Sequence, residues 1–579
     1  MGHMRARQRW TVRAGAGIIA LGLAVMASAC APAKTATPPS PTGGTAKSGG
    51  TVVYALPPLT GVSWYLPLAP VAYDSVYDAN SRSLEYKGLF ETGSNGLPDY
   101  PRSIASSITW NKAGTVYTVK MNPKWHWSNG TPVTAPDVQF NWQMIQAASS
   151  PNAPAPWPWA GYGPDSLPTL VKTFKVVSPY EFQVTTIHPV NQLWFEGMLG
   201  SFTPFPRAAW DKYPNNPAQE LAYLTKNGNN LNFFKVIDGP FRLVKAVAEQ
   251  SWTYVPNPHY DGHKAYLSRL IFTYETSDTS EVSALQTGTV QVGYLPSTEY
   301  AIRNQLTLDR FVAIPSASIA MVFLNFKNPS VGSILSQRPV REALQMGVDQ
   351  TAIIRVVDDN LGITDSGPIV SMSPYLDPAL KKPVYPYNIA QGVKLLEANG
   401  WHMVKGVMTN AQGTPLAFSM TYVSANSATL ATVQLLKQDW GQEGIQVSLT
   451  SLPFPAILHE LHEPTKWQAI AGIGLTGGIG YGVAQSVYAT KGALNFGHYS
   501  NATLDHLMAA ALLPQPSTKA AMAAIYAYQE FVAHHLPNLW MPVGDKFLEI
   551  AKNVHGVLSS VPVRGSFALY PQYWWVGQS

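Results

Sequence analysis

The only cysteine of the 579-residue chain, Cys30, closes an N-terminal segment with an unusual order of basic, apolar and small residues. Four arginines within the first 13 residues precede an apolar run over residues 14–25, and small residues lead up to the cysteine. A basic leader, a short apolar stretch and small residues at the cleavage point are the pattern of a secretory signal, and the run is too short for a membrane-spanning helix. Because no cysteine follows, the exported body must fold without disulfides or cysteine metal sites.

The segment around Cys30 resembles a bacterial lipoprotein signal, in which the cysteine becomes the first mature residue and carries a lipid. Ala27 stands three positions before it, where leucine is the commoner residue. Residues 31–48 are rich in Ala, Pro, Thr and Gly and predict a disordered tether. We therefore expect residues 1–30 to be a signal peptide and the exported protein to be lipid-anchored through Cys30, at the outer face of the cell membrane or in the periplasm. The alternative is ordinary cleavage that leaves a free thiol.

Length and composition indicate several domains and no nucleic-acid partner. A chain of 579 residues exceeds what one hydrophobic core supports, which predicts two or three domains. Only 13% of the residues are charged, the net charge is +5, and the basic residues are scattered, which argues against a nucleic-acid surface. The 17 Trp and 28 Tyr favour a broad, uncharged pocket in addition to the core.

Short strand-like and helix-like segments alternate along the body, which predicts a mixed α/β fold. Strands are predicted at residues 51–56, 115–121, 181–187, 251–257, 270–275 and 445–452. Helices are predicted at residues 339–357, 388–400 and 428–444. Residues 151–165 are rich in Pro and Trp, which regular structure does not tolerate, and they are predicted to be a surface excursion.

Motifs for catalysis or cofactor binding are weak. Residues 472–477, GIGLTG, match the spacing of a dinucleotide-binding loop, but no helix start and no acidic residue about 20 positions on accompany them, so we predict a flexible glycine loop. His459 and His462 lie three residues apart, which does not fit the zinc-protease helix. No nucleophile elbow, phosphate loop or calcium loop occurs in the sequence. We expect no cofactor, no metal and no enzymatic activity; an exported hydrolase is the alternative from a different class.

A strand, a basic-aromatic turn and a helix start follow one another within residues 117–142. Asn129 and Gly130 permit the positive φ of a tight turn, Thr134 can cap the helix, and Pro136 suits an early helical position. Four more segments follow in order, at residues 236–262, 283–293, 323–354 and 388–401. In order and spacing, the five segments resemble the family 5 extracytoplasmic solute-binding proteins of ABC importers, which include oligopeptide-, dipeptide- and nickel-binding proteins.

This resemblance implies an α/β, two-lobed fold of the periplasmic-binding-protein type II class, with an extra inserted domain and a ligand cleft between the lobes. Lobe one would comprise residues 49–90, 186–298 and 542–579, the inserted domain residues 91–185, and lobe two residues 299–541. The implied function is a substrate-binding lipoprotein that captures peptides and delivers them to an ABC permease in the membrane. We expect a monomer whose partners are a peptide or other small-molecule ligand, the permease and the membrane.

The resemblance also places candidate ligand-binding residues in the cleft: Tyr73, Asp74, Tyr77, Asp78, Asp238, Gly239, Phe323, Asn325, Phe454, Ile473 and Thr476. Peptide binders of this family have a Trp and an Asp where this chain has Ile473 and Thr476, and that Asp pairs with the peptide's α-ammonium. A neutral threonine cannot offset the burial of an ammonium group. Either Asp74, Asp78 or Asp238 supplies the charge, or the ligand is an oligosaccharide or another neutral solute without an amine.

Overall fold

The computed structural model describes residues 46–200, 202–563 and 565–577. The predicted signal peptide, Cys30 and nearly all of the predicted tether lie outside these residues. Within the described ranges, no helix combines the length and the apolar character needed to cross a membrane.

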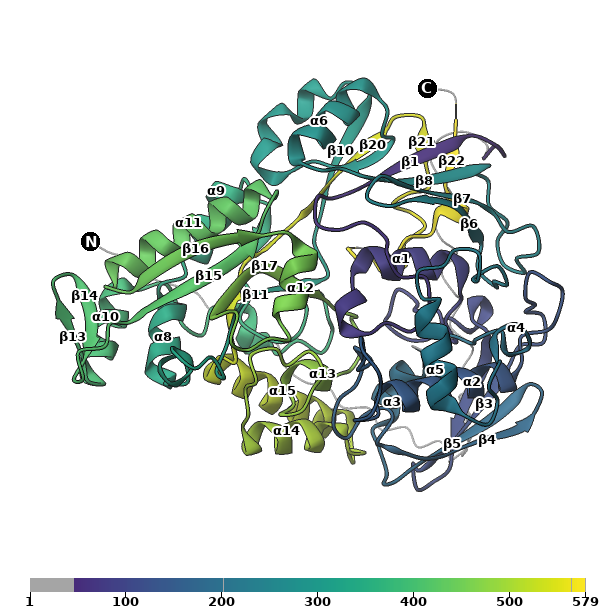
Figure 1. Ribbon diagram of the computed structural model, residues 1–579, viewed down its shortest axis with the longest axis horizontal. Helices are drawn as coiled ribbons and strands as arrows, with labels where there is room; N and C mark the ends of the chain where they lie inside the picture. The colour runs from purple at the N-terminus through teal and green to yellow at the C-terminus, as the bar shows by residue number, and fades with distance from the viewer. Residues whose placement is uncertain (1–45, 201, 564, 578–579) are drawn as a thin grey trace, which may run out of the picture. The chain divides into compact units, whose positions relative to one another are not determined.

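A seven-stranded sheet contains strands from both the N-terminal and the C-terminal part of the folded chain. Its strand order is β10-β20-β9-β1-β8-β7-β6. The strands are β1 (Thr51–Leu56), β6 (Phe241–Val247), β7 (Ser251–Pro256), β8 (Arg269–Tyr274), β9 (Val292–Tyr294), β10 (Asp309–Ile314) and β20 (Lys546–Ala551). β1 runs parallel to β8 and β9, whereas β20 is antiparallel to both of its neighbours. Figure 1 shows the yellow β20 next to the teal β10, so segments distant in the sequence share this sheet.

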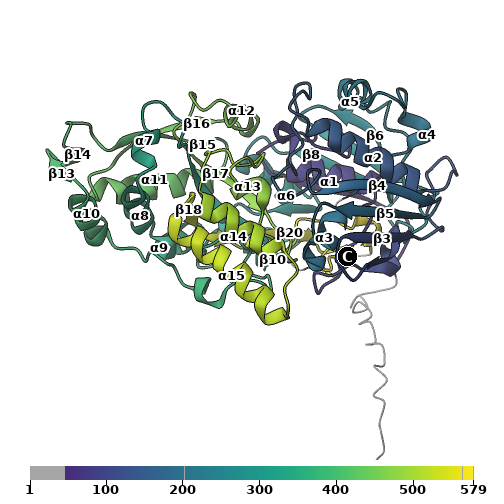
Figure 2. The same ribbon diagram turned by 90° about the horizontal axis from the view of Figure 1, so that it is seen from below.

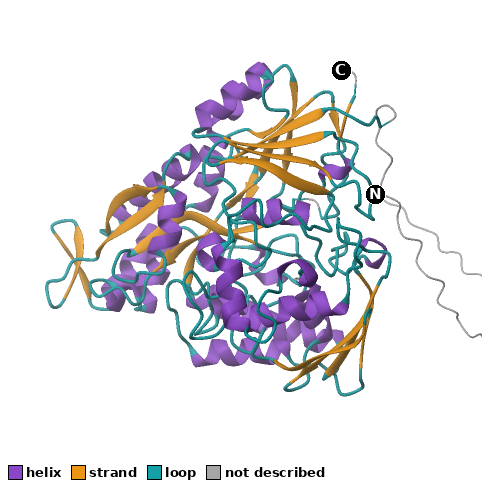
Figure 3. Ribbon diagram, turned by 45° about the vertical axis from the view of Figure 1, so that its right-hand side comes forward, coloured by secondary structure: helices purple, strands orange, loops and turns teal. Residues whose placement is uncertain are grey.

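A five-stranded sheet forms the second large layer. Its order is β16-β15-β17-β11-β18, with β11 (Ser318–Leu324), β15 (Ala417–Val423), β16 (Gln446–Leu452), β17 (Ala469–Thr476) and β18 (Asn538–Met541). α8 (Arg338–Met346) packs on β18, α10 (Ile389–Ala398) packs on α8, and α11 (Ser427–Gln442) packs on β15 and β16. Their shared core includes the fully buried Leu344, Met420 and Trp440. The orange strands in Figure 3 show both large sheets, and Figure 2 shows α14 (Ala502–Leu512) beside α15 (Thr518–His535).

A smaller antiparallel sheet has the order β2-β3-β5-β4, with β2 (Ala105–Trp110), β3 (Val116–Met121), β4 (Val171–Ser178) and β5 (Glu181–Thr186). The helix that packs on it, α2 (Ala135–Ala148), begins as predicted. Gly130 has φ +84°, and Thr134 is the residue that precedes the first turn. The backbone amide of Thr134 donates to the Asp137 carboxylate (2.8 Å), and its hydroxyl donates to the same oxygen (2.9 Å). Local chemistry therefore sets this helix start.

The predicted strands and helices are present, within a residue or two at their ends, with one break. The apolar segment 339–357 forms two helices, α8 and α9 (Gln350–Val357). The break lies at Asp349, whose carboxylate accepts a hydrogen bond from the Ala352 amide (2.8 Å) and caps α9. A side chain that satisfies a free N–H at a new helix start competes with continuation of the preceding helix.

The prediction of a surface excursion at residues 151–165 is wrong for its central part. Trp157 and Ala160 are buried. The Trp157 ring lies edge-on to Trp64, with the ring centres 6.3 Å apart, and its Nε1 donates to Thr225 Oγ1 (2.9 Å). Prolines exclude regular hydrogen bonding but do not exclude burial, and here the tryptophan brings the segment into the core.

The chain passes twice between the two large sheets. It leaves β10 at Ile314 and enters β11 at Ser318, and it leaves β18 at Met541 and enters β20 at Lys546. The second passage includes β19 (Val543–Gly544), which pairs with β12 (Gly362–Ile363). We refer to residues 315–317 and 542–545 as the two crossovers. β10 pairs with β20 in the seven-stranded sheet, although the family resemblance assigns its residues to lobe two. The boundaries of the lobes and of the inserted domain stay a prediction.

The remaining α-helices and strands complete the described fold. They are α1 (Val76–Glu85), α3 (Gln192–Gly200), α4 (Arg207–Trp210), α5 (Pro217–Lys226), α6 (Asp278–Thr287), α7 (Gly332–Leu335), α12 (Phe454–Glu460), α13 (Gln485–Tyr488), β13 (Trp401–Val404), β14 (Val407–Asn410), β21 (Val554–His555) and β22 (Trp575–Val576).

Candidate functional site

A cavity of about 980 Å³ lies between the five-stranded sheet and the start of α1. One wall consists of residues 318–322 of β11 and residues 471–476 of β17. Residues 74–77 face this wall, and the second crossover borders the cavity through Pro542 and Gly544. The size is at the upper end of the range for pockets that bind small molecules. The cavity therefore has room for a ligand between the five-stranded sheet and α1.

The wall contributed by β17 is glycine-rich. Gly472 has φ +79° where the pairing of β17 with β11 is irregular, and a Cβ at Gly474 would lie 2.7 Å from the Ile319 carbonyl oxygen. The prediction of a flexible loop at residues 472–477 is therefore wrong for 472–476, because these residues belong to β17 and residues 473–476 pair with β11, with Thr476 opposite Ser318. Glycines are required here because the two strands approach closely.

Beyond β17 the same wall continues as backbone without regular structure. Residues 477–482 contain four further glycines and line the cavity. In the described part of the chain, the amides of residues 478–482 donate no hydrogen bond to another backbone group. A backbone N–H that lacks an internal partner and borders a cavity is a ready donor for a ligand carbonyl.

Two carboxylates are the only charged side chains among the described residues that line the cavity. Asp74 is exposed to the cavity just before α1, whose N-cap, Ser75, accepts a hydrogen bond from the Asp78 amide (3.0 Å). Desolvation by the surrounding protein raises the pKa of the Asp74 carboxyl, and the positive charge of the nearby Arg82 opposes this shift. Asp358 lies at the end of α9, where burial raises the pKa of its carboxyl to about 6. The cavity thus favours neutral or cationic groups over anionic ones.

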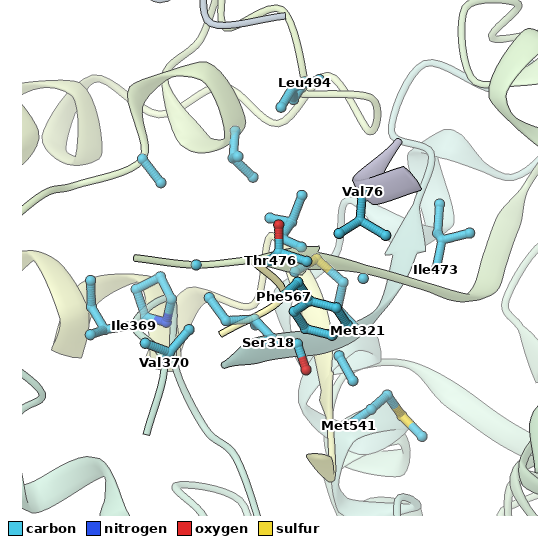
Figure 4. A pocket seen from close by; sticks show the side chains of 18 of the residues that line it. Val76, Ser318, Met321, Ile369, Val370, Ile473, Thr476, Leu494, Met541 and Phe567 are labelled. Atoms are coloured by element: carbon cyan, nitrogen blue, oxygen red, sulfur yellow. The ribbon is translucent and has the colours of Figure 1, made fainter. Parts of the chain in front are cut away.

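Five of the predicted site residues line the cavity. They are Asp74, Tyr77, Phe454, Ile473 and Thr476. Figure 4 shows Ile473 and Thr476 on either side of Met321, with Val76 close by. Direct ligand contact by these side chains stays a prediction.

The other six predicted residues are held by contacts within the protein. Tyr73 stacks on Trp64, with the ring centres 4.7 Å apart, and Phe323 packs edge-on against Phe496. Asp78 Oδ1 accepts from the amides of Ser63 (2.8 Å) and Trp64 (2.9 Å).

Asp238 Oδ1 accepts from the Lys87 amide (2.9 Å), and burial raises the pKa of the Asp238 carboxyl to about 7. A Cβ at Gly239 would lie 2.4 Å from the Leu84 carbonyl oxygen, so this glycine permits a close backbone approach. Asn325 Nδ2 donates to two backbone oxygens in the segment 464–467, at 2.8 Å each. None of the six is among the residues that line the cavity, so Asp74 is the one of the three candidate acids that borders it.

Sequence reasoning missed Asp358 and Phe567, which also line the cavity. Asp358 follows a helix whose apolar pattern carries no ligand signal, and Phe567 lies in a loop near the C-terminus. The abundant Tyr and Trp favoured a broad, uncharged pocket; among the described residues that line the cavity, tyrosines are present, namely Tyr77, Tyr481 and Tyr488, but no tryptophans. They are mostly core residues instead.

The histidine pair that was considered as a metal site lies elsewhere. His459 Nδ1 is 3.3 Å from Glu463 Oε1 on the exposed end of α12. Across the described ranges, no group of three or more His, Cys, Asp or Glu side chains is arranged to hold a metal ion.

Sequence comparison finds relatives that match the chain over most of its length. The oligopeptide-binding protein AppA of Bacillus subtilis is 21% identical over 518 residues, which are 88% of this chain and 90% of AppA. The periplasmic oligopeptide-binding protein OppA of Salmonella typhimurium is 23% identical over 430 residues, 70% of this chain and 72% of OppA. Protein XP55 of Streptomyces lividans is 24% identical over 331 residues, and this match spans 56% of the chain and 58% of XP55.

Solved structures share the fold. AppA from Bacillus subtilis in complex with a nonapeptide superimposes with a TM-score of 0.79 at 18% identity, covering 92% of this chain and 100% of AppA. NikZ from Campylobacter jejuni in complex with Ni(L-His) gives a TM-score of 0.73 at 18% identity, covering 90% of this chain and 99% of NikZ. The predicted two-lobed α/β fold is confirmed by these likenesses. The model for bacterial extracellular solute-binding proteins, family 5, matches residues 100–486, and the chain therefore belongs to that family.

Proposed function

We propose that the protein is the extracytoplasmic receptor of an ABC importer and that it captures peptides in the cavity beside β17. The observation that carries this proposal is the glycine-rich wall: residues 478–482 line the cavity, and their amides have no backbone hydrogen-bond acceptor in the described chain. Peptide carbonyls can accept hydrogen bonds from such amides whatever the side chains of the peptide are. The names of AppA and OppA as oligopeptide-binding proteins support the same substrate class.

Asp74 is the proposed partner of the peptide's α-ammonium. It is exposed to the cavity, whereas Thr476, at the position where peptide binders of the family have an acid, is neutral. The pKa of the Asp74 carboxyl is raised by its surroundings, and a bound ammonium group would favour the ionised form. An oligosaccharide has less support, because none of the described residues that line the cavity is a tryptophan whose face could stack on a sugar ring.

Isothermal titration calorimetry with pentaalanine and with N-acetyl-pentaalanine tests this assignment. We expect the wild-type protein to bind pentaalanine at least about tenfold more tightly than the acetylated peptide, because a hydrogen bond between charged groups contributes about 1.5–3 kcal/mol. Asp74→Asn should remove this preference by weakening pentaalanine binding alone. The matched control Glu397→Gln changes an exposed helix carboxylate away from the cavity and should keep the preference.

Three results would contradict the assignment. If neither peptide binds the wild-type protein, peptide capture is wrong. If Asp74→Asn weakens both peptides equally, Asp74 does not contact the amine. If Thr476→Asp tightens pentaalanine binding without tightening the acetylated peptide, the amine docks at the position where the family has its acid.

We further propose that Cys30, which lies outside the described residues, anchors the receptor to the membrane through a lipid and keeps it beside its permease. Cys30→Ser should move the protein from the membrane fraction to the medium or periplasm and lower peptide uptake by cells. The affinity of the purified protein for pentaalanine should stay unchanged, because the anchor is separated from the cavity by the predicted tether. Retention of the variant in the membrane fraction would refute the lipid anchor.

A further inference from the structure

Phe567 lines the cavity, although its position in the sequence lies beyond the residues that match the family model. It lies in the segment after β21, whereas the match ends at residue 486. Figure 4 shows its side chain next to Ser318, Met321 and Thr476. Ser318 and Thr476 are paired across β11 and β17, so the ring occupies the end of the cavity where this strand pair ends.

The first crossover holds the backbone next to this ring. The Ala317 amide donates to the Gly565 carbonyl oxygen (3.0 Å). Gly565 has φ +86°, and a Cβ there would lie 2.1 Å from the Pro315 carbonyl oxygen. Because only glycine allows so close an approach, the path of the chain into Phe567 is tightly restricted.

Lys546, the first residue of β20 after the second crossover, holds the ring itself. Its Nζ donates to the Ser566 carbonyl oxygen (2.8 Å) and lies 3.3 Å from the centre of the Phe567 ring. Within the described ranges, no carboxylate lies within ion-pair distance of this amine. A cation above an aromatic face is attracted to it, most strongly where water is excluded. The first crossover and the start of β20 therefore fix Phe567 in the cavity.

We propose that Phe567 is a specificity-determining residue of this receptor: its ring, held by Lys546, fills the apolar subsite at the Ser318–Thr476 end of the cavity and excludes large side chains of the ligand there. This inference rests on the proposed capture of peptides. A peptide that reaches this end can place only a small side chain beside Thr476. A hydrophobic pocket rejects a group that is too large because the group must displace packed atoms.

Pentaalanine with one phenylalanine placed at each of its five positions in turn provides the probe set. By isothermal titration calorimetry, we expect one of the five peptides to bind the wild-type protein at least about tenfold more weakly than pentaalanine. Phe567→Ala should restore the affinity of that peptide by at least about tenfold and change the other four much less. Trp110→Ala, which removes an exposed aromatic side chain from β2, is the control and should leave the order of the five affinities unchanged. A gain spread evenly over the five peptides, or no gain, would overturn the proposal.

A second measurement requires no peptide, so it tests the position of Phe567 independently of the proposal that the protein captures peptides. Acetylation by acetic anhydride at Lys546, quantified by mass spectrometry relative to the exposed Lys552, should rise severalfold in Phe567→Ala, because the ring no longer covers the amine. Unchanged acetylation would overturn the contact between Lys546 and Phe567 and with it the proposal. If no peptide binds either protein, the proposed function fails, and the acetylation result then decides alone whether Phe567 occupies the subsite.

Discussion

The free energy of unfolding is expected to fall as the pH rises from about 5 to about 9, because several described carboxyl groups are buried without a salt-bridge partner. The clearest case is a group of three between α6 and the seven-stranded sheet: Glu281, Asp309 and Glu549 are 0%, 6% and 0% exposed. Glu281 Oε1 accepts from the Tyr294 amide (3.0 Å), while its Oε2 and all four carboxyl oxygens of the other two have no hydrogen-bond partner. Such groups are far more stable protonated than ionised.

The three carboxyls lie close to one another. Glu549 is opposite Gly293 in the pairing of β20 with β9, and Glu281 Oε1 lies 2.1 Å from the place where a Cβ at Gly293 would be. The groups around them are Glu275, Asp278, Tyr54, Tyr294 and Lys552. Burial, reinforced by neighbouring carboxyls, raises the pKa of Glu281 to about 9 and that of Glu549 to about 8. Burial raises the pKa of Asp309 to about 6, opposed by Lys552.

The sign of the pH dependence follows from proton binding. Between the ordinary glutamate pKa of about 4.3 and the raised value, the folded state keeps a proton that the unfolded state has lost. Each such glutamate therefore lowers the stability by about 1.4 kcal/mol per pH unit within that window. Burial raises the pKa of Glu85 to about 8 and that of Glu443 to about 9, which acts in the same direction. Burial lowers the pKa of Lys546 to about 7. Above pH 7 the folded state has therefore lost a proton that the unfolded state keeps, and this offsets the pH dependence of one buried glutamate.

Urea unfolding at pH 5, 7 and 9, followed by tryptophan fluorescence, measures the effect. Glu281→Gln keeps the shape of the side chain and removes its titration, so the loss of stability per pH unit should shrink by about 1.4 kcal/mol between pH 5 and pH 9. Glu397→Gln, an exposed carboxylate on α10, should leave the slope unchanged. Stability that stays constant or rises over this range would contradict the expectation.

Sequence reasoning located the elements whose signals are local. The strand at Thr51–Leu56 was predicted to the residue, and the start of α2 followed from Gly130 and Thr134. Residues 472–476 were misassigned because glycines carry no side-chain pattern, and only pairing with β11 makes them a strand. Trp157 shows the same limit, because proline predicts irregular backbone and says nothing about burial.

Only some of the residues that line the cavity could be predicted from the sequence, because others come together only through tertiary packing. Asp74 and Thr476 lie in segments whose positions the family resemblance implies, and both line the cavity. Phe567 and Asp358 reach it from a loop near the C-terminus and from a helix end, and their arrival depends on the two crossovers rather than on neighbouring residues. Convergence of distant segments at one site is set by tertiary packing, which a single sequence does not display.

Arg341 is expected to be among the residues whose loss most destabilises the fold, although it lies in a segment that resembles the family and could be mistaken for a ligand contact. It is 4% exposed. Its Nη1 donates to the carbonyl oxygens of Leu335 (3.0 Å) and Ser336 (2.7 Å), at the end of α7. Its Nε and Nη2 donate to the His535 carbonyl oxygen, at the end of α15 (3.2 and 2.9 Å). One guanidinium group thus satisfies the free carbonyls of two helix ends.

Arg341→Met should lower the free energy of unfolding by about 3–5 kcal/mol, because buried carbonyls at two helix ends lose their donors at about 1–3 kcal/mol each. Arg341→Lys should recover only part of this loss, since one ammonium group cannot reproduce the planar fork that reaches both helices. Arg338→Met is the matched control: that side chain is 47% exposed and pairs with Glu342 (2.7 Å), so its loss should cost less than about 1 kcal/mol. Urea unfolding at pH 5 compares the three variants. Equal losses for Arg341→Met and Arg338→Met would show that the helix-end carbonyls find other donors.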